Sequence, residues 1–172
     1  LGIILNALGN LKEAEIYTRK VIKLKPNYAE AHSHLGTILI DLGKLKDAEL
    51  LYRKAIALNP YFADAWCNLS SLELLKGDYE SGLENYEFRF KKEKPSSLYG
   101  NPKIKTIDSK KSQKGEKLLV VSEQGLGDTL QFMRYIPYLK NQGLDVSFCA
   151  QEKLHSLIKA SGIDLNPLTP TQ

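Results

Sequence analysis

The chain has 172 residues, of which 42% are hydrophobic and 26% are charged, and its formal net charge is +4. This composition allows one large or two small globular domains. Because no apolar run reaches the roughly 20 residues that span a bilayer, the sequence predicts no transmembrane segment.

The two cysteines, Cys67 and Cys149, form no Cys-x-x-Cys pair. The sequence therefore predicts neither a disulfide framework nor a zinc knuckle. Reduced thiols are typical of a cytoplasmic protein. The first residue is Leu1 rather than Met, so we expect that a native start precedes it.

The first half of the chain repeats with a period of 34 residues. Gly9, Gly43 and Gly77 lie 34 positions apart, and the same interval joins Gly2 to Gly36, Leu8 to Leu42, Leu11 to Leu45, Ala14 to Ala48, Pro26 to Pro60, and Leu35 to Leu69. In the central unit, residues 29–62, apolar residues follow helical spacing over 29–42 and 45–58. Gly43 separates the two stretches and Pro60 closes the second, so each unit is predicted to be a pair of helices.

This pattern resembles the tetratricopeptide repeat, which the central unit matches with Leu35, Gly36, Gly43, Ala48, Tyr52, Ala55 and Pro60. The first unit begins within its leading helix. The third departs from the pattern, with Ser70 in place of Gly36, Gly82 in place of Ala48 and Arg89 in place of Ala55. The resemblance implies an α-helical solenoid over residues 1–94, continuing before Leu1, in which Trp66 has a packing role.

Stacked helical pairs form a curved array with a concave inner face. The resemblance places the first helix of each pair there, which offers Glu30, Ser33, His34 and Thr37 from one repeat and Asp64, Cys67, Asn68 and Ser71 from the next. These polar residues suit an extended peptide backbone, although they are also ordinary for an exposed helix face.

Asn68 falls where the repeats of O-linked N-acetylglucosamine transferase place a groove asparagine, and His34 occupies the equivalent position one repeat earlier. No Lys or Arg lies on these turns, so a clamp for a peptide carboxylate is not predicted. The spacing of His32, His34 and His155 predicts no metal site.

Residues 95–116 are predicted to be a basic flexible linker. Nine Lys and three acidic residues fall between positions 91 and 117, among Pro, Gly and Ser. With one aromatic residue, Tyr99, and no Arg, this segment does not favour nucleic-acid binding.

Residues 117–172 change to alternating strand and helix. The pattern predicts strands over 117–122 and 145–150 with a third from 163 to 165, and helices over 128–141, bent at Pro137, and 152–160. This order predicts the opening of a small, incomplete Rossmann-like α/β sheet with parallel strands. The Gly-Leu-Gly turn lacks the third glycine of a dinucleotide fingerprint and the lysine of a P-loop, so no cofactor is predicted.

The run from Glu123 to Tyr135, after a degenerate repeat ending at Arg89, is similar to bacterial tetratricopeptide proteins that continue into a GT-B glycosyltransferase domain. Its Gly-Leu-Gly-Asp part resembles the acceptor-side turn of heptosyltransferases. The resemblance implies that Asp128 is a general base toward an acceptor hydroxyl, with Gln124, Gly125 and Gly127 lining the cleft. The residues alone favour a simpler role for Asp128, as the N-cap of the following helix.

A two-lobed transferase needs a second lobe for its nucleotide sugar, and residues 117–172 are expected to supply only the opening of the first. The sequence therefore predicts a scaffold that binds an extended peptide or protein partner, attached to a glycosyltransferase-like segment without activity at this length. The alternative is a part of an active sugar transferase that uses Asp128. Open strand edges also predict self-association through the α/β segment, and no membrane partner is predicted.

Overall fold

The computed structural model describes residues 2–96, 98, 100, 103, 113–123 and 125–170. The chain divides into two compact units, Leu1–Pro95 and Ser96–Gln172. Most of the predicted linker lies outside the described residues, and so does Gln124.

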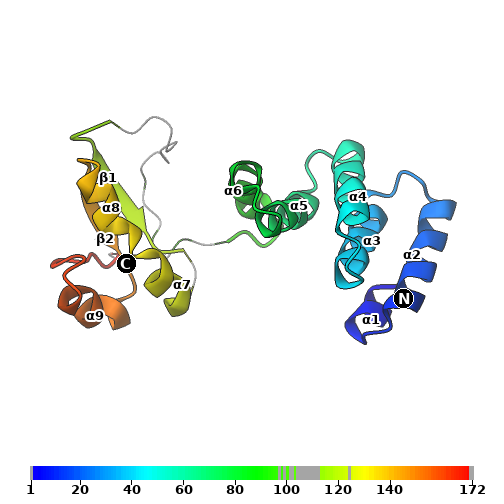
Figure 1. The fold of residues 1–172 in the computed structure, drawn as a ribbon, viewed down its shortest axis with the longest axis horizontal. Coiled ribbons are helices and arrows are strands. Elements are labelled where there is room, and N and C mark those ends of the chain that lie inside the picture. Colours follow the sequence, from blue (N-terminus) through cyan, green and yellow to red (C-terminus); the bar gives the residue numbers. More distant parts are fainter. Residues whose placement is uncertain are drawn as a thin grey trace. The chain divides into compact units, whose positions relative to one another are not determined.

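The first unit consists of helices in sequential pairs (Figure 1). The pairs are α1 (Gly2–Ala7) with α2 (Leu11–Leu24), α3 (Ala29–Asp41) with α4 (Leu45–Leu58), and α5 (Ala63–Leu75) with α6 (Tyr79–Tyr86), which continues as the 3-10 helix η1 (Glu87–Lys91). Each helix packs on the next one in sequence, and α3 also contacts α5. Contact between the first helices of successive pairs is what stacking into a solenoid requires.

The glycines of the 34-residue period end the first helix of each pair. Gly9, Gly43 and Gly77 have φ values of 78°, 73° and 84°. These values lie in the left-handed region of backbone conformation, which residues with a Cβ atom rarely adopt. After α3, the amide of Gly43 donates to the Ile40 carbonyl and the amide of Lys44 to the Leu39 carbonyl. This is the Schellman arrangement, which satisfies the last carbonyls of a helix.

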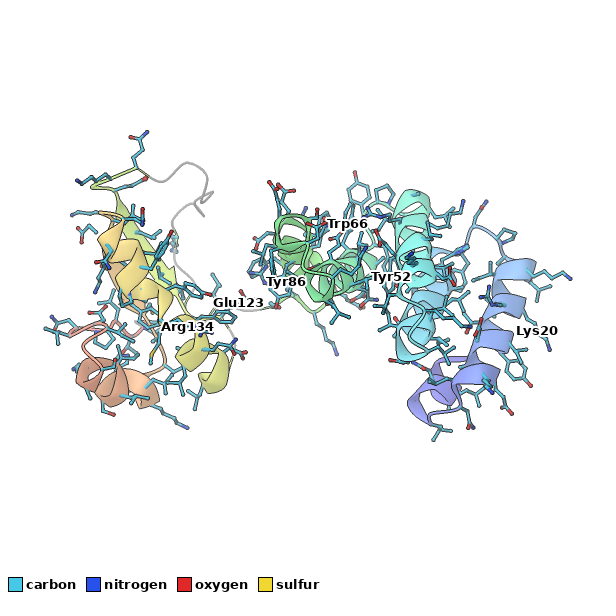
Figure 2. The ribbon with its side chains drawn as sticks, viewed as in Figure 1. Lys20, Tyr52, Trp66, Tyr86, Glu123 and Arg134 are labelled. Atoms are coloured by element: carbon cyan, nitrogen blue, oxygen red, sulfur yellow. The ribbon has the colours of Figure 1, made fainter. Side chains whose placement is uncertain are left out.

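The main core of the first unit lies between the second and third pairs. Its buried residues are Leu35, Leu39, Ala48, Tyr52, Leu69 and Leu72. The ring of Tyr52, labelled in Figure 2, packs directly on Gly36, where an added Cβ would lie 2.6 Å from Cε1 of the ring. The glycine of the Leu-Gly pair and the aromatic residue of the repeat pattern, Gly36 and Tyr52, are therefore in direct contact.

The third pair keeps this packing with exchanged residues. Ser70 stands at the position of Gly36, and its hydroxyl donates to the carbonyl of Gly82 over 2.7 Å. Gly82 stands at the position of Ala48 and makes room for Leu74, whose Cδ2 atom would lie 2.7 Å from an added Cβ. Two departures from the repeat pattern therefore compensate each other within one helical pair.

Arg89 replaces Ala55 and changes the end of the third pair. In the second pair Ala55 packs against Ala65 of the following first helix. The guanidinium of Arg89 instead lies 4.3 Å and 4.0 Å from the ring centroids of Tyr86 and Phe90. The third pair therefore lacks the small residue on which another first helix would pack.

The second unit contains a parallel two-stranded sheet. Strand β1 (Lys117–Val121) pairs with β2 (Asp145–Cys149), with Lys117 opposite Asp145. The crossover contains α7 (Leu126–Phe132) and α8 (Tyr135–Asn141), and β2 is followed by η3 (Glu152–Leu154) and α9 (His155–Ala160). Ile136, Val146, Phe148, Ala150, Leu154 and Ile158 form its buried cluster.

Two local expectations for this unit are wrong. The single bent helix over 128–141 is two helices, and Pro137 lies in the first turn of α8. The amides of a first turn have no partner within their helix, so the missing amide of proline costs little there. The third strand was expected at 163–165, whereas a parallel bridge joins Cys149 to Leu168 further along the chain.

Candidate functional site

The eight residues predicted to line a groove all lie on α3 and α5, which contact each other. Residues three or four apart share one helix face. The eight are Glu30, Ser33, His34 and Thr37 on α3, and Asp64, Cys67, Asn68 and Ser71 on α5.

Ser33 and Cys67 are buried, at 2% and 9% exposure, whereas the other six are half-buried or exposed. The side-chain amide of Asn68 donates to the Ser33 hydroxyl over 3.3 Å, which joins the second helical pair to the third. The hydroxyl of Thr37 lies 3.2 Å from that of Tyr52. Ser33 and Cys67 therefore lie beneath this face, and the side chains available to a partner come from the other six residues.

Lys92 adds a cation that the sequence analysis missed. Its Nζ lies 2.8 Å from Oδ1 of Asp64, and this hydrogen bond raises the pKa of Lys92. One repeat earlier the equivalent position is Leu58, the last residue of α4. Leu58 packs in a cluster that includes Ala29 and Ala65, which lie in the first turns of α3 and α5. The 34-residue register could have indicated that Lys92 approaches the beginning of α5.

Two side chains of this face have shifted pKa values. Loss of hydration lowers the pKa of His34, although the nearby carboxylates of Glu30 and Asp64 act in the opposite direction. Burial raises the pKa of the Cys67 thiol. His34 is therefore neutral and Cys67 is a protonated thiol near neutral pH.

His32 and Trp66 occupy equivalent positions and make equivalent hydrogen bonds. Nε1 of Trp66 donates to the Pro60 carbonyl over 2.9 Å, and Nε2 of His32 hydrogen-bonds the Pro26 carbonyl over 2.8 Å. The ring of Trp66 also stacks on Phe88, with centroids 4.5 Å apart. Both side chains hold helical pairs together. Within the described part of the chain, no group of three His, Cys, Asp or Glu residues could hold a metal ion.

A second candidate site is the turn between β1 and α7. Gly125 is the N-cap of α7, so Asp128 is not the N-cap but a half-buried residue of the first helical turn. The hydroxyl of Thr129 donates to Oε1 of Gln151 over 2.9 Å, which connects this turn to the segment after β2. Gly127 has no described atom within 4 Å of an added Cβ.

Among the described residues, no helix is long and apolar enough to cross a membrane.

Comparison with known proteins identifies the helical pairs. Three family models, each of the Tetratricopeptide repeat, match residues 1–28, 29–62 and 51–84. No curated protein matches the chain.

Solved structures that are similar to this chain match about half of its length. The TPR2B domain of yeast Sti1, solved as a pHsp70 complex, is 24% identical with a TM-score of 0.50, and the match covers 52% of this chain and 73% of that one. MamA is 23% identical with a TM-score of 0.48, over 51% of this chain and 52% of its own. YrrB, described as a TPR protein with an unusual peptide-binding site, is 28% identical with a TM-score of 0.48, over 52% and 46%.

The chain thus spans about half the length of the MamA and YrrB structures. These matches concern the helical repeats and do not bear on a glycosyltransferase domain. Residues 1–84 are tetratricopeptide repeats, which form a helical solenoid in the first half of this protein.

Proposed function

We propose that the repeats are a protein-interaction scaffold that binds an extended segment of a partner along the face of α3 and α5. The observation that carries this proposal is the set of six accessible polar side chains on two contacting helices, namely Glu30, His34, Thr37, Asp64, Asn68 and Ser71. An extended backbone presents an N–H and a C=O group at nearly every residue, and each needs a partner when it is covered. The Sti1 domain, which has the same fold, was solved with pHsp70.

Asn68 has the central role in this proposal. Its amide uses one N–H group to reach Ser33, and a primary amide has a second N–H group and a carbonyl oxygen. Those two groups can pair with one peptide unit of the bound segment. Ser71, one helical turn further along α5, is exposed and its hydroxyl donates to the Cys67 carbonyl.

Peptide selection with the full chain tests the proposal. Peptides that bind are selected from a library of random dodecapeptides. Their affinities are measured by fluorescence anisotropy for the wild type, for Asn68→Ala and Ser71→Tyr, and for a control, Lys54→Ala, whose substitution lies on α4. We expect both α5 variants to weaken binding by about fivefold or more, because one loses hydrogen bonds and the other adds bulk. Equal affinities for all four proteins would refute the proposed face.

A second proposal is that residues 117–172 belong to the acceptor lobe of a sugar transferase, which is active only as part of a longer protein. The supporting observation is that Asp128 lies in the helix that follows the carboxyl end of β1, and its neighbour Thr129 is bonded to Gln151 after β2. Ligands of parallel α/β sheets bind at this end of the strands. Asp128 would there remove the proton of an acceptor hydroxyl, with Gly125, Gly127 and Gln124 beside it.

Sugar transfer by a longer form of the protein tests this second role. Asp128→Asn is expected to lower the rate at least about a hundredfold, whereas Asp145→Asn, at the opposite end of β2, should leave it unchanged. An active Asp128→Asn protein would remove the catalytic role.

We also infer a cytoplasmic location, which is supported by two buried cysteines that form no disulfide. Self-association through the strand edge of the second unit is a further proposal. Sedimentation over a range of concentrations tests it, and a constant monomer mass would refute it.

A further inference from the structure

We propose that the segment bound by α3 and α5 is cationic, an extended peptide that carries Lys or Arg side chains. This inference rests on the proposed scaffold function and names the chemistry of its partner. It follows from the distribution of charge over the helices of the repeats.

The first helices of the pairs carry no positive charge. The helices α1, α3 and α5 contain no Lys or Arg, and their charged residues are Glu30, Asp41, Asp64 and Glu73. Two of the second helices, α2 and α4, are basic, whereas α6 contains Glu80 and Glu84 and no Lys or Arg. In α2 and α4 the cations are Lys12, Arg19, Lys20, Lys23, Lys46, Arg53 and Lys54, against the acids Glu13, Glu15, Asp47 and Glu49. The helices α3 and α5 are therefore opposite in charge to α2 and α4.

The acidic residues of α3 and α5 differ in whether a Lys or Arg side chain already pairs with them. Glu73 is 3% exposed and pairs with Arg53, so it is part of the core. Asp64 is 58% exposed and pairs with Lys92. Glu30 and Asp41 form no ion pair with another described residue. The accessible face thus has carboxylates that an incoming cation can pair with.

Two further observations support a cationic occupant. His34 lies near both Glu30 and Asp64, but loss of hydration lowers its pKa and keeps it neutral near neutral pH. It therefore leaves their negative charge in place. Lys92 lies at the edge of the same face, where its ammonium group already occupies Asp64. An ammonium or guanidinium group of a partner can pair with Glu30 and exchange with Lys92 at Asp64, whereas an acidic peptide would be repelled.

The test uses two labelled peptides, six Lys-Ser repeats and six Glu-Ser repeats, with the full chain at low and physiological salt. Anisotropy measures binding, and NMR amide shifts locate it. We expect the Lys peptide to bind with shifts on α3 and α5, more weakly at higher salt, and the Glu peptide not to bind. Glu30→Lys should weaken the Lys peptide about tenfold, because it replaces an attraction by a repulsion.

Asp47→Lys is the matched control. Asp47 is an exposed acid in the first turn of α4, as Glu30 is in the first turn of α3, and the substitution changes the net charge equally. It should alter the affinity less than twofold. Equal binding of the two peptides, no binding of the Lys peptide, shifts confined to other helices, or equal losses in both variants would overturn the inference.

Peptides selected from the random library separate this inference from the function on which it rests. If selected peptides bind α3 and α5 but carry no excess of Lys or Arg, the scaffold function stands and the charge preference is wrong. If they shift neither helix, the proposed face itself is wrong.

Discussion

Replacing Gly36 by alanine should destabilise the repeats although alanine is the better helix former. An added Cβ would lie 2.6 Å from Cε1, 2.9 Å from Cδ1 and 3.1 Å from Cζ of Tyr52, and all three distances are shorter than van der Waals contact. The ring is 3% exposed, and its hydroxyl is hydrogen-bonded to Thr37, so it has no free space in which to move. Overpacking of this kind costs about 1–3 kcal/mol, and disturbing the hydrogen bond costs about 1 kcal/mol more.

The helix propensity of alanine offsets about 1 kcal/mol of this cost. The net expectation is a loss of about 1–3 kcal/mol in the free energy of unfolding, measured by urea unfolding with circular dichroism of the helices. In a Tyr52→Leu background, whose shorter side chain can turn away, the same Gly36→Ala change should be neutral or stabilising by up to about 1 kcal/mol. An equal effect of Gly36→Ala in both backgrounds would refute the role given to the ring.

Four further outcomes follow from the structure. Glu73 accepts hydrogen bonds from Arg53 and Asn85 in the core, so Glu73→Ala should cost about 3 kcal/mol in urea unfolding while Glu73→Leu should cost less than about 1; equal losses would contradict this. The hydrogen bond from Lys76 holds the pKa of Glu49 below its usual value. The ionised Glu49 therefore stabilises the fold at pH values above the usual pKa of a Glu side chain, and this stabilisation is lost as the pH falls through the lowered pKa. Glu49→Gln should therefore cost about 0.5–1 kcal/mol near neutral pH and nothing in acid, and a loss that persists in acid would argue against the ion pair. The NMR titration midpoint of His34 should lie below 6.5 and fall further in Glu30→Gln; a midpoint at or above 6.5 would count against its loss of hydration. Gly127→Ala should keep or raise the stability of the second unit in thermal unfolding, because no described atom lies within 4 Å of the new methyl, and a destabilised protein would mean that this position is crowded.

The irregular third repeat shows how a helical array can change its sequence without changing its packing. The exchange of small residues between Ser70 and Gly82 keeps α5 and α6 in contact. Arg89 does the reverse, because it places a guanidinium, which lies over the rings of Tyr86 and Phe90, at the position where Ala55 packs against the next first helix. The first departure is neutral for the fold, and the second marks where the regular repeat ends.

The repeats could be predicted from the sequence because their signals are local. A helix ends where a glycine takes a positive φ, as Gly43 does, and a second helix cannot continue through Pro60. The apolar spacing of each helix then selects the face that packs. These effects act within one or two turns of the chain, so the period of 34 residues predicts the helical pairs and their order.

The tertiary structure decided the features that depend on contacts between distant segments. Ser33 and Cys67 have the spacing of accessible residues but are buried, because exposure depends on how closely neighbouring helices approach. Lys92 reaches Asp64 only because the end of the third pair returns to the beginning of α5. Likewise, Leu168 pairs with Cys149 at the end of β2, whereas residues 163–165 do not. Which residues pair depends on the position of the neighbouring strand and not only on the local sequence. The conformational preferences of neighbouring residues thus determined where the helices lie in the sequence. Which side chains are buried, and which charges pair, was determined by the packing of helices against one another.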